Sequence, residues 1–253
     1  MTKFNLLKNM MKEEWRIHST LFGHLRFGLF PLVIIIFGFI GSLAISVFGI
    51  LFSKISMIIF THYIFMFFGA NVGAFGLIGK EFMNRRFGQA SLIAYSSRTL
   101  PLSERIIFLN MLIKDVLYYF ILWIIPLIIG FALASPILRM DISYVFLFLL
   151  TLSLSFLIGV SLVFFLSVIY AHSGKIFIFA LLLIGVFSFF FIKDFITIFP
   201  PLMYFMNKDI NQIGISVCLI LIPSIFATIF ISLDFPAKKN SFENSLKNMK
   251  KLF

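Results

Sequence analysis

Few residues of this chain are of the kinds that perform chemistry, and their spacing assembles no reaction centre. The four histidines include no His-Glu-x-x-His pair, so the zinc site of a metalloprotease is not predicted. Segment 13–16 carries two carboxylates and an arginine, but no histidine set completes a metal site there. This pattern is typical of surface charges at a helix flank. We therefore expect no catalytic residue, no metal and no enzyme activity in this chain.

One stretch superficially resembles a phosphate-binding loop, because Gly79 is followed by Lys80. The motif needs a glycine five residues before Gly79, where this chain has Ala74. It also needs Ser or Thr after the lysine, where this chain has Glu81. We therefore expect no bound ATP and no other cofactor.

Polar side chains inside apolar segments are candidates for function, because they are costly in a membrane. His62 and Asn71 lie in the second apolar run and are candidate residues of a substrate path. Lys114 and Asp115 begin the third run, where we expect them to snorkel to the inner surface or to pair. No acidic chain crosses the apolar runs, which disfavours a carrier driven by protons or sodium ions.

The composition fixes the class of element that must position these residues. The chain has 253 residues, of which 61% are hydrophobic and 12% are charged, and its mean hydropathy is +1.08. A soluble domain carries about 25% charged residues, and disorder requires low hydrophobicity. The apolar residues form long unbroken runs rather than the alternation of an outer-membrane strand. The sequence therefore predicts an all-α membrane protein.

Six apolar stretches are at or near the roughly 20 residues that cross a bilayer as a helix. We expect membrane helices at 27–53, 55–79, 106–138, 142–170, 176–192 and 210–233. A further apolar run, 195–207, contains Pro200 and Pro201 and is too short to cross. It is expected to be a short re-entrant or extracellular segment between the fifth and sixth helices. The whole chain is expected to form one transmembrane domain.

Most of the 21 Lys and Arg residues lie in three segments, 1–26, 80–105 and the basic tail 234–253. Such segments stay on the cytoplasmic side. The pattern predicts a multi-pass protein of the cell (plasma) membrane with both termini in the cytoplasm. The net charge of +11 reflects this bias and contact with anionic lipid, and does not indicate nucleic-acid binding.

The segment 1–26 has the pattern of an amphipathic helix. Lys8, Lys12 and Arg16 form a basic row four residues apart, and Trp15 belongs to an apolar row. We expect a helix lying in the inner membrane interface, with its cations among the headgroups. The alternative is a solvated helix that packs on another protein.

Small residues recur in the second apolar run, at Gly69, Gly73 and Gly76. This spacing lets another helix approach closely. Packing inside one subunit and dimerisation are equally compatible with it.

The segment 80–105 is the one sizeable internal loop that the pattern predicts. We expect an extension of the second helix into water, a short helix lying on the inner surface, and re-entry at Pro101, with Ser103 as a helix cap. Such an element is suited to receive a push from a cytoplasmic partner. A plain solvated loop is the alternative.

The order of residues in this loop resembles the first cytoplasmic loop of the ABC-2 type permeases, the six-helix membrane subunits of ATP-binding-cassette exporters. The shared features are an acidic residue at Glu81, the basic pair Arg85-Arg86 before Gly88, an apolar stretch, Leu-Pro-Leu-Ser at 100–103, and then Lys114. The amphipathic start, the six crossings and the short segment 195–207 also resemble this family. Gly-Gln-Ala-Ser at 88–91 departs from the Gly-Thr-x-Glu that the family often has.

The resemblance implies a mechanism in which a separate cytosolic ATPase subunit binds and hydrolyses ATP as a dimer and presses on segment 81–105 and on the N-terminal helix. It also implies a second permease subunit, identical or different, with the substrate path between the two, lined by the first, second and fifth helices. The coupling residues implied are the arm Glu81, Arg85, Arg86, Phe87 and Gly88, the ATPase contact Leu92, Ile93 and Tyr95, and the re-entry set Pro101, Ser103 and Glu104. An immunity or assembly factor of the membrane is the alternative function. An intramembrane enzyme is disfavoured.

Overall fold

The computed structural model describes residues 3–48, 53–87 and 104–230, and every regular element in these ranges is a helix. The helices are α1 (Lys3–Phe22), α2 (His24–Gly28), α3 (Phe30–Phe48), α4 (Lys54–Phe87), α6 (Glu104–Tyr119), α7 (Ile125–Ala134), α8 (Ile142–His172), α9 (Gly174–Ile198), α10 (Pro200–Asn207) and α11 (Ile210–Phe230). A π-helical turn, Phe120–Ile124, joins α6 to α7 so that the two form one continuous rod. The prediction of an all-helical protein is confirmed.

Five helical segments of the described chain are long and apolar enough to cross a membrane. They are Leu25–Ala44, Ile55–Ala74, Leu112–Ala134, Ile142–Tyr170 and Ile210–Phe230. These segments lie within five of the six predicted crossings or overlap them. The sixth, 176–192, lies within α9, whose apolar part in the described residues is the shorter stretch Gly174–Val186. The protein is therefore of the all-α membrane class.

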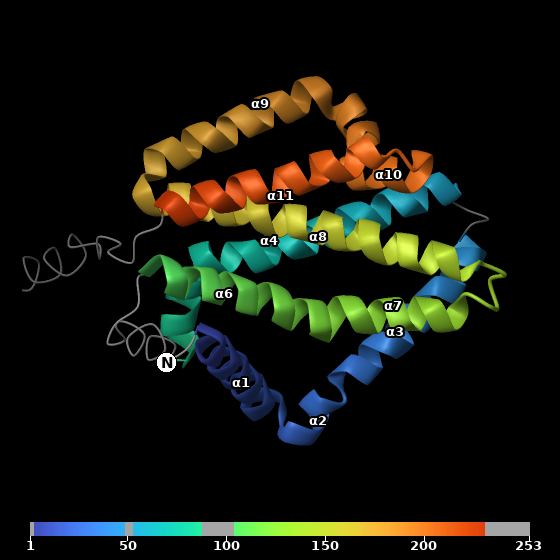
Figure 1. Ribbon diagram of the computed structural model, residues 1–253, viewed down its shortest axis with the longest axis horizontal. Helices are drawn as coiled ribbons and strands as arrows, with labels where there is room; N and C mark the ends of the chain where they lie inside the picture. Colours follow the sequence, from blue (N-terminus) through green and yellow to red (C-terminus); the bar gives the residue numbers. More distant parts are fainter. Residues whose placement is uncertain (1–2, 49–52, 88–103, 231–253) are drawn as a thin grey trace, which may run out of the picture.

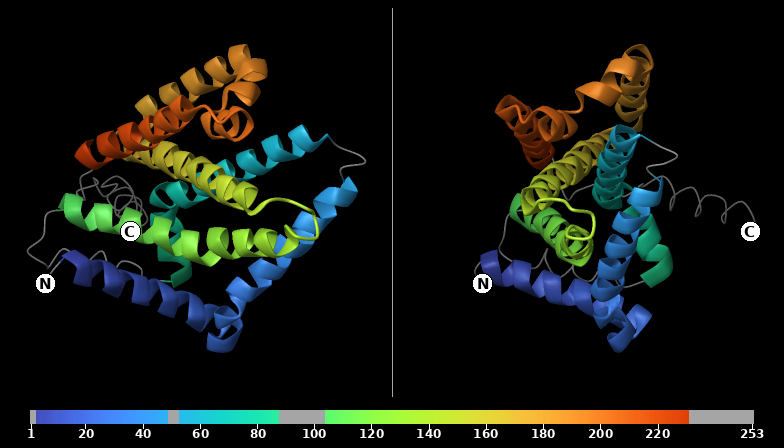
Figure 2. Two further views of the ribbon diagram at one scale, coloured as in Figure 1. Left: turned by 45° about the vertical axis from the view of Figure 1, so that its right-hand side comes forward. Right: turned by 90° about the vertical axis from the view of Figure 1, so that its right-hand side faces the viewer.

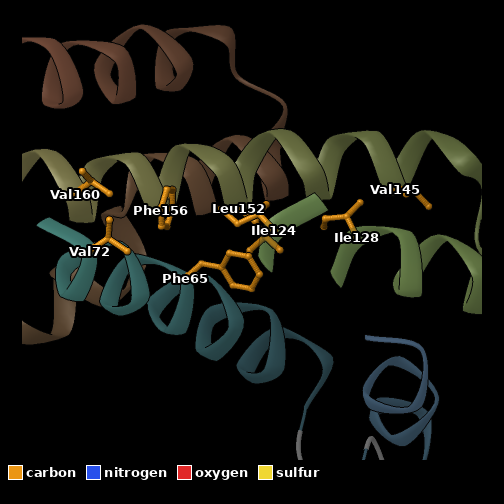
Figure 3. Packing of buried hydrophobic residues seen from close by; sticks show 8 residues of the cluster. All are labelled: Phe65, Val72, Ile124, Ile128, Val145, Leu152, Phe156 and Val160. Atoms are coloured by element: carbon orange, nitrogen blue, oxygen red, sulfur yellow. The ribbon is translucent and has the colours of Figure 1, made fainter. Parts of the chain in front are cut away.

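The long helices run side by side, with α8 between α4, α11 and the α6–α7 rod (Figure 1). α8 packs most extensively on α4 and then on α11, while α3 packs along α7. The buried centre lies where α4, α8 and the α6–α7 rod meet, as Figure 3 shows. Its residues are Phe65, Val72, Ile124, Ile128, Val145, Leu152, Phe156 and Val160.

Glycines set how closely the paired helices approach. A Cβ atom built at Gly69 would lie 2.0 Å from the carbonyl oxygen of Phe156, and one at Gly159 would lie 2.0 Å from that of Met66. Neither position admits a side chain unless α4 and α8 move apart. Gly38 on α3 faces the backbone of α7 in the same way. Small residues thus let these helix backbones touch, as is common in membrane bundles.

Helix α9 stands apart from the rest of the bundle (Figures 1 and 2). It leaves α8 at Ser173, whose hydroxyl oxygen accepts a hydrogen bond from the Ile176 amide and caps the new helix. Its described large apolar side chains, from Ile176 to Val186, are mostly exposed. Packing within the chain therefore covers little of this helix.

The short helix α10 returns the chain from α9 to α11. It begins at Pro200 and Pro201, which suit the first turn of a helix, and ends where Lys208 adopts a left-handed conformation with φ 55°. Its eight residues are too few to cross a membrane. The predicted non-crossing segment began at 195, but residues 195–198 belong to the end of α9.

The N-terminal segment is two helices rather than one. Gly23 has φ 82°, which breaks the helix after Phe22, and α2 then leads into α3. The segment predicted as a single interface helix, 1–26, therefore contains a corner (Figure 1). The first apolar span begins at Leu25, so it includes most of α2 as well as α3.

Candidate functional site

The predicted coupling arm is the end of a long helix. α4 has 34 residues and continues without a break from its apolar span, which ends at Ala74, to Phe87. Glu81, Arg85 and Arg86 therefore lie on a helix that continues well beyond the span. This agrees with the expected extension of the second helix.

Beyond Phe87, the next described residue of the coupling loop is Glu104. α6 begins at Glu104, eight residues before the third apolar span, which starts at Leu112. The other predicted coupling residues, Gly88, Leu92, Ile93, Tyr95, Pro101 and Ser103, lie outside the described residues.

The amphipathic helix α1 has an exposed basic row. Lys8 and Lys12 are exposed, and the exposed Arg16 pairs with Glu13 on the same helix at 3.0 Å. Trp15 is half-exposed and packs edge-on against the ring of Phe27, 4.8 Å away. The four predicted interface residues are thus accessible to lipid headgroups.

The opposite side of α1 packs on α6 and α2, and it contains an ion cluster. The Nζ atom of Lys114 lies 2.5 Å from Oε2 of Glu14 and 2.9 Å from Oδ1 of Asp115. The side chains of Lys114 and Glu14 are 12% and 18% exposed. Removing one member of so shielded a pair typically costs about 3–5 kcal/mol, because the other charge is left unpaired.

Only half of this cluster was predicted from the sequence. Pairing was one expectation for Lys114 and Asp115, but the prediction that Glu14 is a surface charge at a helix flank is wrong, because its side chain is shielded and contacts Lys114. The sequence did contain one signal, the spacing of four residues between Met10, Glu14 and His18; the structure shows that Met10 in this row is buried. Residues four apart share a helix face, so Glu14 lies with Met10 on the packed side of α1.

Of the two polar residues predicted for a substrate path, His62 is completely buried. Its Nδ1 atom is 2.8 Å from the carbonyl oxygen of Ile58, and its Nε2 atom has no hydrogen-bond partner among the described residues. The rings of Phe148 and Phe205 lie edge-on to the imidazole, at 5.8 and 5.7 Å. His62 therefore sits in an aromatic contact between α4, α8 and α10, not on an open surface.

Asn71 is exposed, in contrast to His62. Its Nδ2 atom donates a hydrogen bond to the carbonyl oxygen of Phe67, 2.8 Å away. Phe60, Ile64 and Phe67 are also exposed and continue the same stripe along α4. The stripe Phe60–Ile64–Phe67–Asn71 is thus the outward face of α4, and it carries one amide within an apolar span.

The predicted small-residue positions pack within the chain. Gly69 meets the backbone of Phe156, and Gly73 meets that of Val160, both on α8. The two alternatives for these residues were packing inside one subunit and dimerisation, and the contacts of Gly69 and Gly73 are of the first kind. Gly76 lies farther along α4, and its surroundings are outside the described side chains.

The described part of the chain holds no group of three or more His, Cys, Asp or Glu side chains that could bind a metal ion. A groove of about 710 Å³ runs along α11, past Ile210, Gly214 and Cys218. Its walls are almost entirely apolar, which suits lipid chains better than a polar reactant.

Comparison of the chain with known protein families, with curated proteins and with solved structures returns no match. The class that the fold defines is an all-helical membrane protein with a helical arm beyond its second apolar span.

Proposed function

We propose that this chain is the membrane-spanning subunit of an ATP-driven exporter of the ABC-2 type. A separate cytosolic ATPase subunit would act on segment 80–105. The observation that carries the proposal is the continuous helix α4, which joins an apolar span to the charged arm at Glu81, Arg85 and Arg86. A helical arm that is continuous with a membrane span can pass a force from the cytoplasmic side to that span, whereas a plain solvated loop does not.

The proposal includes six crossings, with α9 as the fifth. α9 has 25 residues, which reach about 37 Å at about 1.5 Å per residue, more than a bilayer core requires. In this arrangement the N-terminus, segment 80–105 and the basic tail face the cytoplasm of a cell (plasma) membrane. The preponderance of Lys and Arg in these segments supports that orientation.

The substrate path would lie between two such subunits, and the outward stripe of α4 is the best candidate for its wall. An amide in contact with lipid chains is costly, and its bond to Phe67 uses only one of its donors. An aqueous path or a second subunit would supply the missing polar partners. Asn71 fits this role, whereas the buried His62 does not.

The proposal is tested by purifying the affinity-tagged chain from its native membranes into lipid nanodiscs. We expect an ATP-hydrolysing protein to co-purify. Glu81→Gln and Arg85→Gln should reduce its recovery or its activity at least several-fold, because they alter the arm. Arg139→Gln is the matched control, since Arg139 is an exposed cation in the turn between α7 and α8. A chain that purifies without any ATPase would refute the proposal and favour an immunity or assembly factor.

The path wall has a separate test that uses a water-soluble maleimide on the same complex. In a Cys218→Ser background, Asn71→Cys should be modified because its position would be wetted. Leu117→Cys is the control, since Leu117 is also exposed and lies at a similar distance from the end of its apolar segment. Equal modification at both positions, or none at either, would contradict a path along α4.

A further inference from the structure

The ion cluster of Lys114 connects two helices that are a hundred residues apart in the sequence. Asp115 is the neighbour of Lys114 on α6, and Glu14 comes from α1. The contact with Asp115 holds the lysine side chain on its own helix, while the contact with Glu14 crosses to the other helix. The ammonium group of Lys114 thus contacts two carboxylates, one on α1 and one on α6.

Aromatic rings shield the cluster from water on one side. The ring of His18 lies 5.2 Å from that of Tyr118 and 5.7 Å from that of Phe27. Tyr118 and Phe27 are both buried, as is Met10, which lies four residues from Glu14 on the same side of α1. Charges shielded in this way interact more strongly than charges in water, and sliding α1 along α6 would separate them.

The position of the two helices makes this link mechanically significant. α1 precedes the corner that leads into α3, the helix of the first apolar span. α6 opens the third apolar span and follows the coupling loop directly. A displacement of either helix therefore reaches the other if the ion cluster holds them together.

We propose that Lys114 is a positioning residue that locks α1 to α6, so that both helices move as one body when the ATPase subunit acts on the cytoplasmic side. This inference rests on the proposed function and deepens it. The first and third crossings then receive the same displacement. The exposed basic row of α1 remains free to contact lipid while its other side stays fixed to α6.

The test measures the distance between α1 and the α6–α7 rod by pulsed electron paramagnetic resonance. Spin labels are placed at Lys12→Cys and Ile129→Cys, both exposed, in a Cys218→Ser background. The full complex in nanodiscs is compared without nucleotide and after trapping with ATP and vanadate. Lys114→Met removes the central charge. Arg16→Gln is the matched control, because it breaks an ion pair of α1 that is exposed and does not reach α6.

We expect one narrow distance that is the same in both nucleotide states, and the same in Arg16→Gln. In Lys114→Met the width of the distribution should at least double. Glu14→Gln should act in the same direction, and Lys114→Arg should restore a narrow distance, so the test does not depend on the stability of one variant. If the distance between the two labels changed on trapping in the parent chain, the proposal that α1 and α6 move as one body would be refuted. An unchanged width in both Lys114→Met and Glu14→Gln would overturn the role of the ion cluster.

Failure of the proposed function gives a different result. The tagged chain would then bring no ATPase activity into the nanodisc, and vanadate would trap nothing. The widths measured without nucleotide would still decide whether Lys114 holds α1 against α6. If no ATPase co-purified, the proposed function and the role of Lys114 in coupling would both be refuted.

Discussion

Alanine substitution at two glycines of α3, three residues apart, should affect stability differently. A Cβ atom at Gly38 would lie 2.5 Å from the carbonyl oxygen of Leu127 on α7, and 3.2 Å from two more backbone atoms of that residue. A Cβ atom at Gly41 meets nothing within 4 Å. The two sites share a helix and a substitution, so only their surroundings differ.

The magnitude follows from the geometry. To reach the 3.4 Å at which ordinary contact begins, α3 and α7 must separate by about 0.9 Å at Gly38. The obstacle is backbone, which cannot turn aside as a flexible side chain can. Overpacking of this kind typically costs about 1–3 kcal/mol. Both variants gain up to about 1 kcal/mol of helix propensity relative to glycine. That gain cancels in the comparison, so Gly38→Ala should be less stable than Gly41→Ala by about 1–3 kcal/mol.

The assay is reversible unfolding of the purified chain in mixed micelles of increasing SDS content, followed by loss of helical circular dichroism. Gly69→Ala serves as a positive control, because its Cβ atom would lie closer still to a carbonyl oxygen, at 2.0 Å. If Gly38→Ala and Gly41→Ala unfolded at the same SDS content, the close approach of α3 and α7 would be refuted.

Two further predictions use the same unfolding assay. His62→Phe should leave stability within about 1 kcal/mol of the parent. The aromatic contacts are kept, and the loss of the Nδ1 hydrogen bond to Ile58 is offset by removal of the buried Nε2, which has no partner among the described residues. A loss above about 2 kcal/mol would contradict this offset. Ser161→Ala should lose about 0.5–1.5 kcal/mol, since Ser161 bonds Ile220 and Ser224 on α11 at 2.6 and 2.9 Å. Ser153→Ala should lose less, because the hydrogen bond of that hydroxyl within the described residues is to Leu149 on its own helix. An equal loss in both variants would contradict the inter-helix role.

Much of the fold follows from the sequence because a bilayer requires long apolar helices. The runs that became α4, α8 and α11 could be predicted from the spacing of charged residues alone. The break at Gly23 could not, because a glycine in an amphipathic pattern is compatible with a continuous helix. The π-helical turn at 120–124 leaves no mark in hydropathy either.

The polar residues were harder to place than the helices. His62 and Asn71 are both polar residues of one apolar run, and sequence alone gave them the same role. Nine residues along an α-helix make two and a half turns, which places the two on opposite sides. The depth of burial on each side depends on α8 and α10, helices far away in the sequence. The pairing of Glu14 with Lys114 likewise depends on tertiary packing.

The most direct test of the account is a photo-crosslink from the arm of α4. Arg85 is replaced by benzoylphenylalanine in the full chain, and native membranes are irradiated. We expect a covalent adduct with an ATP-hydrolysing subunit, while the same probe at Arg139, in the turn between α7 and α8, should give none. An arm that crosslinks only to lipid or to its own chain, in membranes where the ATPase is present, would contradict the account.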